Sequence, residues 1–383
     1  MNIDDINTIA VIGAGDMGHG IAEVALIAGY KVYLRDIKQE FVDKGVGRIN
    51  ASLEKLVSKG KVPAEHFDKI KNELMAPCTD LAEAVKEADL VIEAIPEIMD
   101  LKKETFAAMD AAAPAHTLFA SNTSTMKITE IASATKRPEK VLGLHYFNPA
   151  VLMKLVEVIK GEKTTDEAMQ IGYDFVVKNN KVPVKVLKDV PGFIVNRVQA
   201  PAGVLLGCLL DQGAIEPEAV DAIFRNMGSP MGPYETMDYT GLDINFHGSA
   251  YFAEAIHEDF RAGKTITAKV KANELGKKTG KGLFDWSAGR PEIDVSKATD
   301  KFDPMDLAIV NANEATKIIA EGACALEDVD TAIINATGSP FGPMALIKGM
   351  EPVDLAQRLE GLAEKFSKEI FKPTQMIKDG DYR

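Results

Sequence analysis

The first forty residues hold the feature that most constrains the fold, a glycine-rich turn enclosed by regular secondary structure. The segment Thr8–Ile12 (TIAVI) is short, apolar and β-branched, which is typical of a buried parallel strand. It leads into Gly13–Gly18 (GAGDMG) and then into a helical pattern over Gly20–Ala28. A second apolar run, Lys31–Leu34, is followed by Asp36. Strand, glycine turn, helix, strand and acid in this order predict a βαβ unit that binds a dinucleotide.

Each residue of this fingerprint has a physical role in such a unit. Gly13 permits the tight turn, Gly15 lets the backbone approach a pyrophosphate, and Gly18 lets helix and strand pack closely. Asp36 would accept hydrogen bonds from the adenosine ribose and repel a 2′-phosphate, which favours NAD over NADP. Arg35 stands beside it, so the strictness of that preference stays open.

Further apolar runs predict that this unit belongs to a larger sheet. We expect a long amphipathic helix over Val42–Lys61, with Ser52 and Lys59 on one face of it. By charge pattern alone, that face is a solvated one. Additional strands are expected at Leu90–Ile95, Thr117–Ala120, Val141–Leu144, Leu155–Ile159 and Pro183–Leu187. The fold class predicted is α/β, a Rossmann-type doubly wound sheet, followed by an all-α region.

Polar side chains cluster where two of these strands end. Ser121–Ser124 (SNTS) lies just past a strand's carboxyl end, the edge at which open α/β sheets bind ligands. His145 follows the next strand, and Glu157 lies in the apolar run after it. A histidine can take and return a proton near neutral pH, and a carboxylate in an apolar strand needs a partner. The stretch itself allows two interpretations: His145 and Glu157 pair for acid–base chemistry, or they are a structural histidine and a strand-edge glutamate.

Beyond Val190 the pattern becomes helical and contains an internal repeat. Ile194–Asn196 and Ile309–Asn311 each precede a related segment, EAVDAIFRNMGSPMGP in the first copy and EDVDTAIINATGSPFGP in the second. Between them, Leu275–Trp286 is basic and glycine-rich, and we interpret it as a closing loop. The expected domains are residues 1–188 (NAD-binding Rossmann), 189–290 (first helical domain) and 300–383 (second, repeat-related helical domain).

Composition excludes several functions. The net charge of −13 leaves no basic face for nucleic acid. Cys78, Cys208 and Cys324 show no metal-ligand spacing, so we expect no metal site and a reduced, cytoplasmic protein. The acidic start runs directly into a strand, so no signal peptide is expected. No apolar run approaches the ~18 residues of a membrane span, so no membrane partner is expected.

Seven segments together resemble the 3-hydroxyacyl-CoA dehydrogenase family over essentially the whole chain. In combination they are far more specific than any one motif. The segments are GAGDMGHGIA, VIEAIPE, FASNTST, GLHYFNPAVLMKLVEV, VPGFIVNR, SPMGPYETMDYTGLD and KKTGKGLFDW.

The resemblance assigns roles residue by residue. It implies that His145 is the catalytic base, that Glu157 orients it, and that Ser124 and Asn196 line the substrate site. It implies that Ser52 and Lys59, together with Ser124, contact coenzyme A, contrary to the charge-pattern interpretation of that helix face. Positions that would contact NAD are Gly13, Gly15, Gly18, Asp36, Glu97, Lys102, Asn148 and Lys278.

The chain departs from the short family members by carrying the second helical copy. That copy lacks the DYTGLD segment and has Ala312 where Arg197 follows the first asparagine, so we expect it to pack rather than catalyse. Similar tandem copies in multifunctional relatives cover the first copy within one chain. The resemblance thus implies a monomer with pseudo-dimeric helical domains, or a weak homodimer. Because similar archaeal chains continue into an enoyl-CoA hydratase, this one is either free-standing or part of such a fusion.

The resemblance implies reversible, NAD-dependent oxidation of an (S)-3-hydroxyacyl-CoA, with the short-chain 3-hydroxybutyryl-CoA as the default substrate. One alternative is a dehydrogenase on the same scaffold that acts on a free hydroxy acid or sugar acid, as the lambda-crystallin-like gulonate dehydrogenases do. Another is a non-catalytic NAD-binding protein. The joint presence of His145, Glu157, Ser124 and Asn196 argues against the latter.

Overall fold

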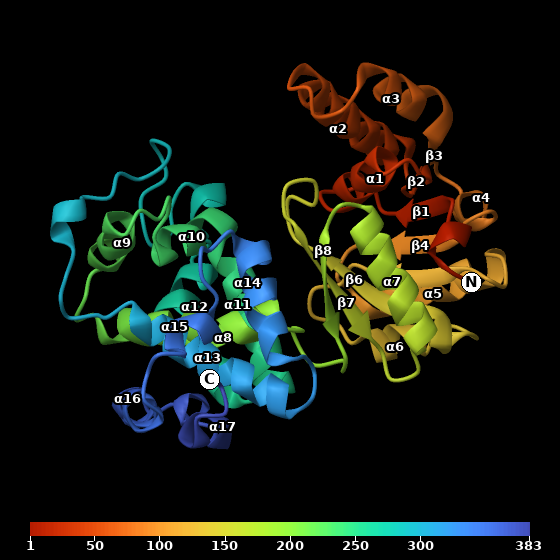
Figure 1. Ribbon diagram of the computed structural model, residues 1–383. Helices are drawn as coiled ribbons and strands as arrows, with labels where there is room; N and C mark the ends of the chain where they lie inside the picture. The colour runs from red at the N-terminus through yellow and green to blue at the C-terminus, as the bar shows by residue number, and fades with distance from the viewer. The chain divides into compact units, whose positions relative to one another are not determined.

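The chain divides by its contacts into two compact units. The computed structural model describes residues 1–383 (Figure 1). The first unit comprises Met1–Ile194 and Gly322–Pro340, and the second comprises Val195–Glu321 and Phe341–Arg383. The expected division at residue 188 and near residue 300 remains a proposal. The contacts differ from it in placing Gly322–Pro340, from the second helical copy, with the first unit.

The first unit is built on an eight-stranded sheet in the order β3-β2-β1-β4-β5-β6-β7-β8. Neighbouring strands are parallel except for β6 and β7, which run antiparallel. The strands are β1 (Thr8–Ile12), β2 (Lys31–Arg35), β3 (Met75–Cys78), β4 (Leu90–Glu93), β5 (Leu118–Ser121), β6 (Val141–Tyr146), β7 (Leu155–Lys160) and β8 (Val182–Val186). The predicted Rossmann-type α/β class is confirmed, with β3 as a strand that the sequence pattern did not indicate.

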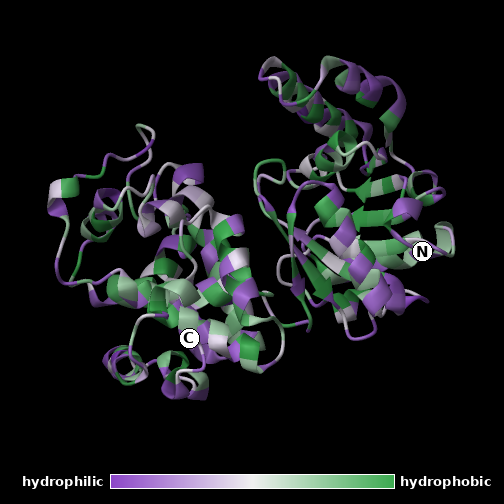
Figure 2. Cartoon of the chain, viewed as in Figure 1, coloured by the Kyte–Doolittle hydropathy of each residue, from purple (hydrophilic) through white to green (hydrophobic).

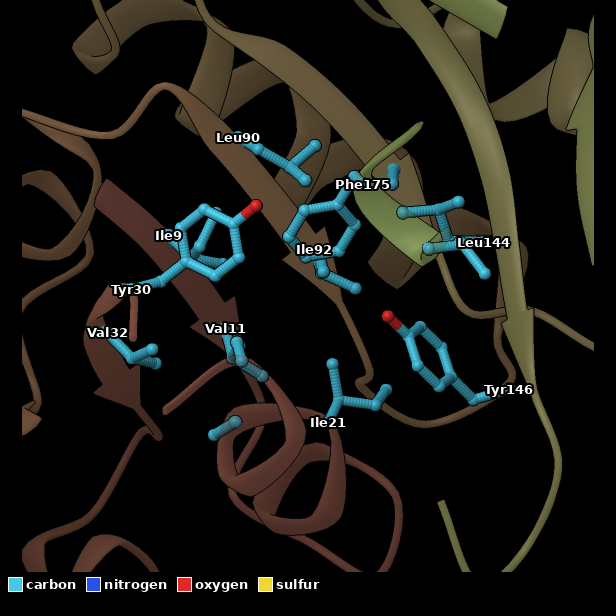
Figure 3. Close-up of a cluster of buried hydrophobic side chains, with 14 of the residues drawn as sticks. Ile9, Val11, Ile21, Tyr30, Val32, Leu90, Ile92, Leu144, Tyr146 and Phe175 are labelled. Carbon is cyan, nitrogen blue, oxygen red and sulfur yellow. The ribbon is translucent and has the colours of Figure 1, made fainter. Parts of the chain in front are cut away.

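Helices cover this sheet and bury its apolar side chains. Almost all residues of β1, β4, β5, β6 and β7 are buried, and the strands are correspondingly hydrophobic in Figure 2. Figure 3 shows the aromatic side chains of Tyr30, Tyr146 and Phe175 in the same buried cluster as Ile9 and Ile92. Burying such side chains is the main favourable term that holds the sheet and its helices together.

The helices of the first unit begin with the one that follows the glycine turn. In chain order the α-helices are α1 (Gly18–Ile27), α2 (Gln39–Ser58), α3 (Ala64–Lys69), α4 (Leu81–Val85), α5 (Met99–Ala112), α6 (Ile128–Ala132) and α7 (Asp166–Lys178). Short helical turns are η1 (Ile3–Asp5), η2 (Ile70–Leu74) and η3 (Pro138–Lys140). The second copy of the repeat contributes α14 (Leu326–Thr337), which packs against β7 and β8.

The second unit contains helices and turns but no strand, apart from isolated β-bridges at Gly276, Lys281 and Asp285. Its α-helices are α8 (Val195–Gln212), α9 (Pro217–Asn226), α10 (Pro233–Thr240), α11 (Leu242–Ala255), α12 (Lys264–Lys271), α13 (Met305–Ala320), α15 (Pro343–Ile347), α16 (Pro352–Phe366) and α17 (Gln375–Asp379). Its short turns are η4 (Glu258–Phe260), η5 (Lys277–Thr279), η6 (Val295–Lys297) and η7 (Glu369–Phe371). No helix in the protein is long and apolar enough to cross a membrane.

The two copies of the repeat pack together inside this unit through α8 and α13. Pro201 lies within α8 and cannot donate a backbone hydrogen bond. The next amide, Ala202 N, donates instead to the side-chain Oδ1 of Asn311 on α13 at 3.1 Å. Asn311 is the repeat counterpart of Asn196, so in the second copy this asparagine binds the backbone of the first, a packing contact.

Candidate active site

The glycine turn at the end of β1 is shaped for a phosphate group. Gly13 has a φ of +106°, and a Cβ built on it would lie 2.4 Å from Ala94 O. A Cβ on Gly18 would lie 1.8 Å from Gly13 O, so both positions require glycine. A Cβ on Gly15 would meet nothing within 4 Å, which leaves open space at the start of α1. A helix N-terminus with that space in front of it suits the pyrophosphate of a dinucleotide.

Asp36 lies at the end of β2, beside the same turn. Its Oδ2 accepts a hydrogen bond from Ala14 N at 2.8 Å, and its Oδ1 accepts one from Ile37 N at 2.7 Å. The neighbouring Arg35 directs its Nε to Thr79 O at 2.9 Å. The carboxylate is therefore fixed against the glycine turn, and the guanidinium is engaged elsewhere. The residues present fit NAD, with Asp36 placed for the ribose hydroxyls.

A buried lysine joins the ends of β4 and α5. Lys102 is almost fully buried, and its Nζ lies 2.6 Å from Glu93 Oε1 and 3.1 Å from Glu97 Oε2. Glu93 also accepts a hydrogen bond from Ser121 Oγ at the end of β5, at 2.6 Å. Glu93 thus fixes both Lys102 and the segment that carries Ser124. Glu93 was not among the predicted site residues; an acid in an apolar strand, which needs a partner when buried, is the signal that could have identified it.

Glu97 ties the polar cluster after β5 to this lysine. It accepts hydrogen bonds from Thr123 Oγ1 at 2.5 Å, from Ser124 N at 3.0 Å and from Thr125 Oγ1 at 3.3 Å. Burial alone would raise the pKa of Glu97, but the charge of Lys102 and these hydrogen bonds outweigh it and hold the pKa below its usual value. Glu97 is therefore an anionic acceptor next to Ser124, and the structure brings Glu97, Lys102 and Ser124 together.

His145 and Glu157 form a buried pair across the antiparallel strands β6 and β7. They lie directly opposite each other in the register, and His145 Nδ1 is 2.7 Å from Glu157 Oε2. Glu157 is fully buried, and its Oε1 accepts a hydrogen bond from Ile194 N at 2.9 Å. The predicted contact between the two side chains is confirmed. With Nδ1 donating to the carboxylate, Nε2 is the imidazole nitrogen left to accept a proton.

Aromatic rings set the plane of this imidazole. The centroid of the Phe147 ring lies 4.4 Å from that of His145, and the centroid of Phe193 lies 5.8 Å away. Phe193 belongs to the segment that ends in Ile194, so the same stretch of chain contacts both members of the pair. Asn148 follows Phe147 at the exposed start of the loop between β6 and β7, joined to Pro149 by a cis peptide bond.

Two of the three residues expected to contact coenzyme A, Ser52 and Lys59, lie on α2 and at its end. Ser52 Oγ donates to Glu23 Oε1 on α1 at 2.6 Å, and Lys59 is exposed at the helix C-cap. Burial raises the pKa of Glu23 to about 7, against the lowering effects of Ser52 and Lys181. The exposed ammonium of Lys59 is available to a phosphate. The contact of Ser52 with Glu23 was not predicted, because the two residues lie on different helices.

The remaining predicted site residues, Asn196 and Lys278, lie in the second unit. Asn196 is in the first turn of α8. Lys278 lies in the glycine-rich segment Leu275–Trp286, which was interpreted as a closing loop, and it forms an ion pair with Asp243 on α11. That loop is held by the buried carboxylate of Asp238, which accepts hydrogen bonds from Leu283 N, Phe284 N and Trp286 Nε1 at 2.8, 2.8 and 2.9 Å.

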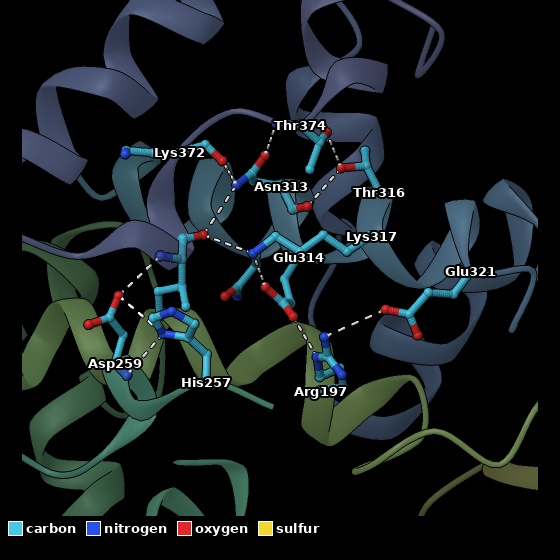
Figure 4. A network of polar contacts seen from close by, with 12 residues as sticks. Arg197, His257, Asp259, Asn313, Glu314, Thr316, Lys317, Glu321, Lys372 and Thr374 are labelled. Atoms are coloured by element: carbon cyan, nitrogen blue, oxygen red, sulfur yellow. Dashed lines mark hydrogen bonds and ion pairs between the residues drawn. The ribbon is translucent and has the colours of Figure 1, made fainter. Parts of the chain in front are cut away.

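Arg197, next to Asn196, connects the two helical copies. Figure 4 shows its Nε reaching Glu314 Oε1 on α13, at 2.5 Å, with both side chains buried. The other carboxylate oxygen of Glu314 lies 2.7 Å from Lys317 Nζ. The second copy thus supplies the acid that neutralises the arginine, while its own equivalent of that arginine is Ala312.

Comparison with known proteins identifies similar sequences for both parts of the chain. Residues 8–190 match the NAD binding domain of 3-hydroxyacyl-CoA dehydrogenase, and residues 192–286 match its C-terminal domain. The chain is 40% identical over 305 residues to 3-hydroxyadipyl-CoA dehydrogenase of Escherichia coli K12, covering 79% of this chain but only 64% of that relative. It is 38% identical over 289 residues to the probable 3-hydroxybutyryl-CoA dehydrogenase of Bacillus subtilis, covering 74% of this chain and 98% of that relative.

A solved structure resembles the chain over nearly its full length. The crystal structure of 3-hydroxybutyryl-CoA dehydrogenase from Escherichia coli K12 superposes with a TM-score of 0.90 at 29% sequence identity, covering 98% of both chains. The likeness therefore includes the second helical copy as well as the two matched domains.

Proposed function

The chain belongs to the 3-hydroxyacyl-CoA dehydrogenase family and is an NAD-dependent oxidoreductase, and on this premise we propose its reaction, its catalytic residues and its substrate range. It oxidises the hydroxyl group of an (S)-3-hydroxyacyl-CoA to a ketone, reversibly, with His145 as the general base and Glu157 as its orienting partner. The observation that carries the proposal is the buried contact between His145 Nδ1 and Glu157 Oε2 at 2.7 Å.

In the proposed mechanism, His145 Nε2 takes the proton from the C3 hydroxyl. The Gly13–Gly18 turn and Asp36 would hold NAD⁺, which would supply the acceptor for the hydride on C3. Glu157 holds the imidazole in the tautomer with Nδ1 protonated and stabilises the positive charge that the ring gains. Its second oxygen is occupied by Ile194 N, so the carboxylate cannot rotate away from the histidine without losing that bond.

Other side chains fix the reactants. We propose that Ser124 and Asn196 bind oxygens of the substrate, and that Asp36, Glu97, Lys102, Asn148 and Lys278 join the glycine turn in binding NAD. The hydrogen bonds around Glu97 support this, because they hold Ser124 and Lys102 in one preorganised cluster. Lys59 would bind a phosphate of coenzyme A through its exposed ammonium at the end of α2. Ser52 would also bind coenzyme A, once its hydrogen bond to Glu23 is released.

The proposed substrate is a short-chain acyl-CoA, with 3-hydroxybutyryl-CoA as the default. The test measures NADH consumption with acetoacetyl-CoA, with the 3-keto derivatives of longer and dicarboxylic acyl-CoAs, and with free acetoacetate. We expect turnover with acetoacetyl-CoA and little with the free acid. Equal activity on the free acid would contradict a CoA-dependent site, and a preference for the dicarboxylic thioester would replace the short-chain assignment.

We further propose that the protein acts as a monomer in the cytoplasm, on its own or as the dehydrogenase part of a fusion with an enoyl-CoA hydratase. The packing of α8 against α13 supports a monomer, because the second helical copy already covers a face of the first helical copy. Sedimentation velocity at micromolar concentration tests it. A single species of about twice the chain mass would favour a dimer instead.

A further inference from the structure

The loop between β6 and β7 is held by a lysine with no role in the reaction proposed above. This loop, Phe147–Lys154, begins two residues after His145 and carries Asn148. It lies against α1, because a Cβ built on Gly20 would come within 3.1 Å of Ala150 Cβ. Lys181, at the turn between α7 and β8, also contacts the loop. The loop is thus in contact with both the dinucleotide-binding helix and this lysine.

The ammonium of Lys181 is saturated by backbone carbonyls of the loop. Its Nζ lies 2.6 Å from Ala150 O, 3.1 Å from Val151 O and 2.7 Å from Met153 O. An ammonium has three donors, and these contacts use all of them. An irregular loop leaves carbonyls that need donors when they are taken out of water. The half-buried ammonium of Lys181 therefore supplies the hydrogen-bond donors that backbone amides supply to carbonyls in a strand or helix.

The backbone of Lys181 is itself anchored, so the ammonium has a fixed origin. Asn180, just before it, adopts a left-handed conformation with a φ of +56°. Lys181 N donates to Val176 O at 3.1 Å, which ends α7, and Val182 N donates to Lys154 O at 2.8 Å, which joins the loop to β8. Hydrogen bonds thus fix Lys181 at both its backbone and its ammonium, and the residue joins the loop to the turn before β8.

The charges around Lys181 are few. From α1, Glu23 faces it, and its charge favours the protonated amine. The nearest lysines on the same segment are engaged elsewhere: Lys178 pairs with Asp4 at 3.6 Å, and Lys185 donates to Gln170 at 3.0 Å. Lys154, at the end of the loop, is exposed. Burial lowers the pKa of Lys181 to about 8, with Glu23 opposing that shift.

We propose that Lys181 is a positioning residue for the cofactor end of the active site: by binding three carbonyls of the Phe147–Lys154 loop, it holds in place Asn148, three residues after His145. The inference rests on the proposed role of Asn148 in NAD binding. It assigns no contact between Lys181 and the reactants. Its effect passes through the loop, so loss of Lys181 should weaken NAD⁺ binding as well as turnover.

The test compares Lys181→Met with the matched control Lys178→Met, three residues away on the surface of α7. NAD⁺ affinity is measured by calorimetry without substrate, and steady-state kinetics and melting temperature are measured alongside. For Lys181→Met we expect kcat/KM for NAD⁺ to fall by roughly 10- to 100-fold, as when a site element shifts by about an ångström. Lys178→Met should match the parent protein. Unchanged NAD⁺ affinity and turnover in a Lys181→Met protein that merely melts lower would overturn the proposal.

A second variant covers the case in which Lys181→Met does not fold. Lys181→Arg keeps a charge at all accessible pH values. In the parent protein, NAD⁺ affinity should decline as the pH rises past about 8, where Lys181 loses a proton and one carbonyl loses its donor. In Lys181→Arg that decline should be absent. The same decline in both proteins would overturn the assignment. NAD⁺ affinity is measured without acyl-CoA. Inactivity toward every acyl-CoA would therefore refute the proposed function, while the NAD⁺ affinities would still test the role of Lys181.

Discussion

His145 Nδ1 and Glu157 Oε2 lie 2.7 Å apart, and the two residues face each other across the antiparallel strands β6 and β7. Because they are direct register partners in the antiparallel pair of β6 and β7, their side chains lie on one face of the sheet. Ile194 N fixes the other carboxylate oxygen. The pair is therefore built by the sheet itself, with little freedom for either group to turn away.

Glu157→Gln tests the orienting role of the carboxylate. The amide keeps the size of the side chain but can present an N–H to Nδ1, which favours the wrong tautomer of His145. We expect kcat to fall by about 10²- to 10⁴-fold, with NAD⁺ affinity within a few-fold of the parent. Steady-state kinetics and calorimetry together check this. Parent-like turnover would mean that Glu157 serves only to stabilise the fold.

Asp36→Ala tests the basis of cofactor choice. Removing the carboxylate deletes the proposed acceptor for the ribose hydroxyls and the bond from Ala14 N. We expect kcat/KM for NAD⁺ to fall by about 10- to 100-fold, the equivalent of one charged hydrogen bond, while that for NADP⁺ rises or stays level. The ratio of the two values is the measurement. An unchanged ratio would show that Asp36 does not discriminate between the cofactors.

Arg197 and Glu314 offer a stability test inside the second unit. Arg197→Met leaves a buried carboxylate with Lys317 as its remaining ionic partner, so unfolding should need about 3 kcal/mol less. The double variant Arg197→Met with Glu314→Leu should recover most of that loss, because no unpaired acid remains. Urea denaturation of both proteins checks this. A double variant as unstable as the single one would argue against charge pairing as the cause.

Glu23 gives a pH-dependent prediction whose sign follows from its burial. Its pKa is raised from 4.5 in the unfolded chain to about 7 in the fold, so the protonated acid is favoured there. Its stabilising contribution is complete below about pH 4.5 and is lost as the pH rises through 7. Glu23→Gln should therefore be more stable than the parent at pH 8, by up to about 3 kcal/mol, and similar at pH 4.5. Equal stability at both pH values would contradict the raised pKa.

Several parts of the fold were predictable because they depend on local patterns. The apolar runs at Thr8, Leu90 and Val141 became β1, β4 and β6, and the glycine spacing led to α1. The strand β3 (Met75–Cys78) could not be found in this way. It contains Pro77 and no β-branched residue, which an edge strand tolerates but a pattern search does not recognise.

Motifs indicated the candidate site residues, but most connections between them could not be predicted. The expected contact between His145 and Glu157 is confirmed, whereas the ion pair of Lys102 with Glu97 was not expected. The link from Glu93 to Ser121 joins positions 28 apart, and that from Glu23 to Ser52 joins positions 29 apart. Such contacts depend on which strands and helices become neighbours, and no local pattern records that. For the same reason, the packing of α14 on β7 and β8 was not expected.

We propose His145 as the general base of a hydroxyacyl-CoA dehydrogenase. His145→Ala, assayed for acetoacetyl-CoA reduction and for NADH binding in the same preparation, tests it most directly. We predict a turnover lower by about 10²- to 10⁴-fold with NADH affinity nearly unchanged. Near-normal turnover in a folded variant that binds NADH would contradict the claim.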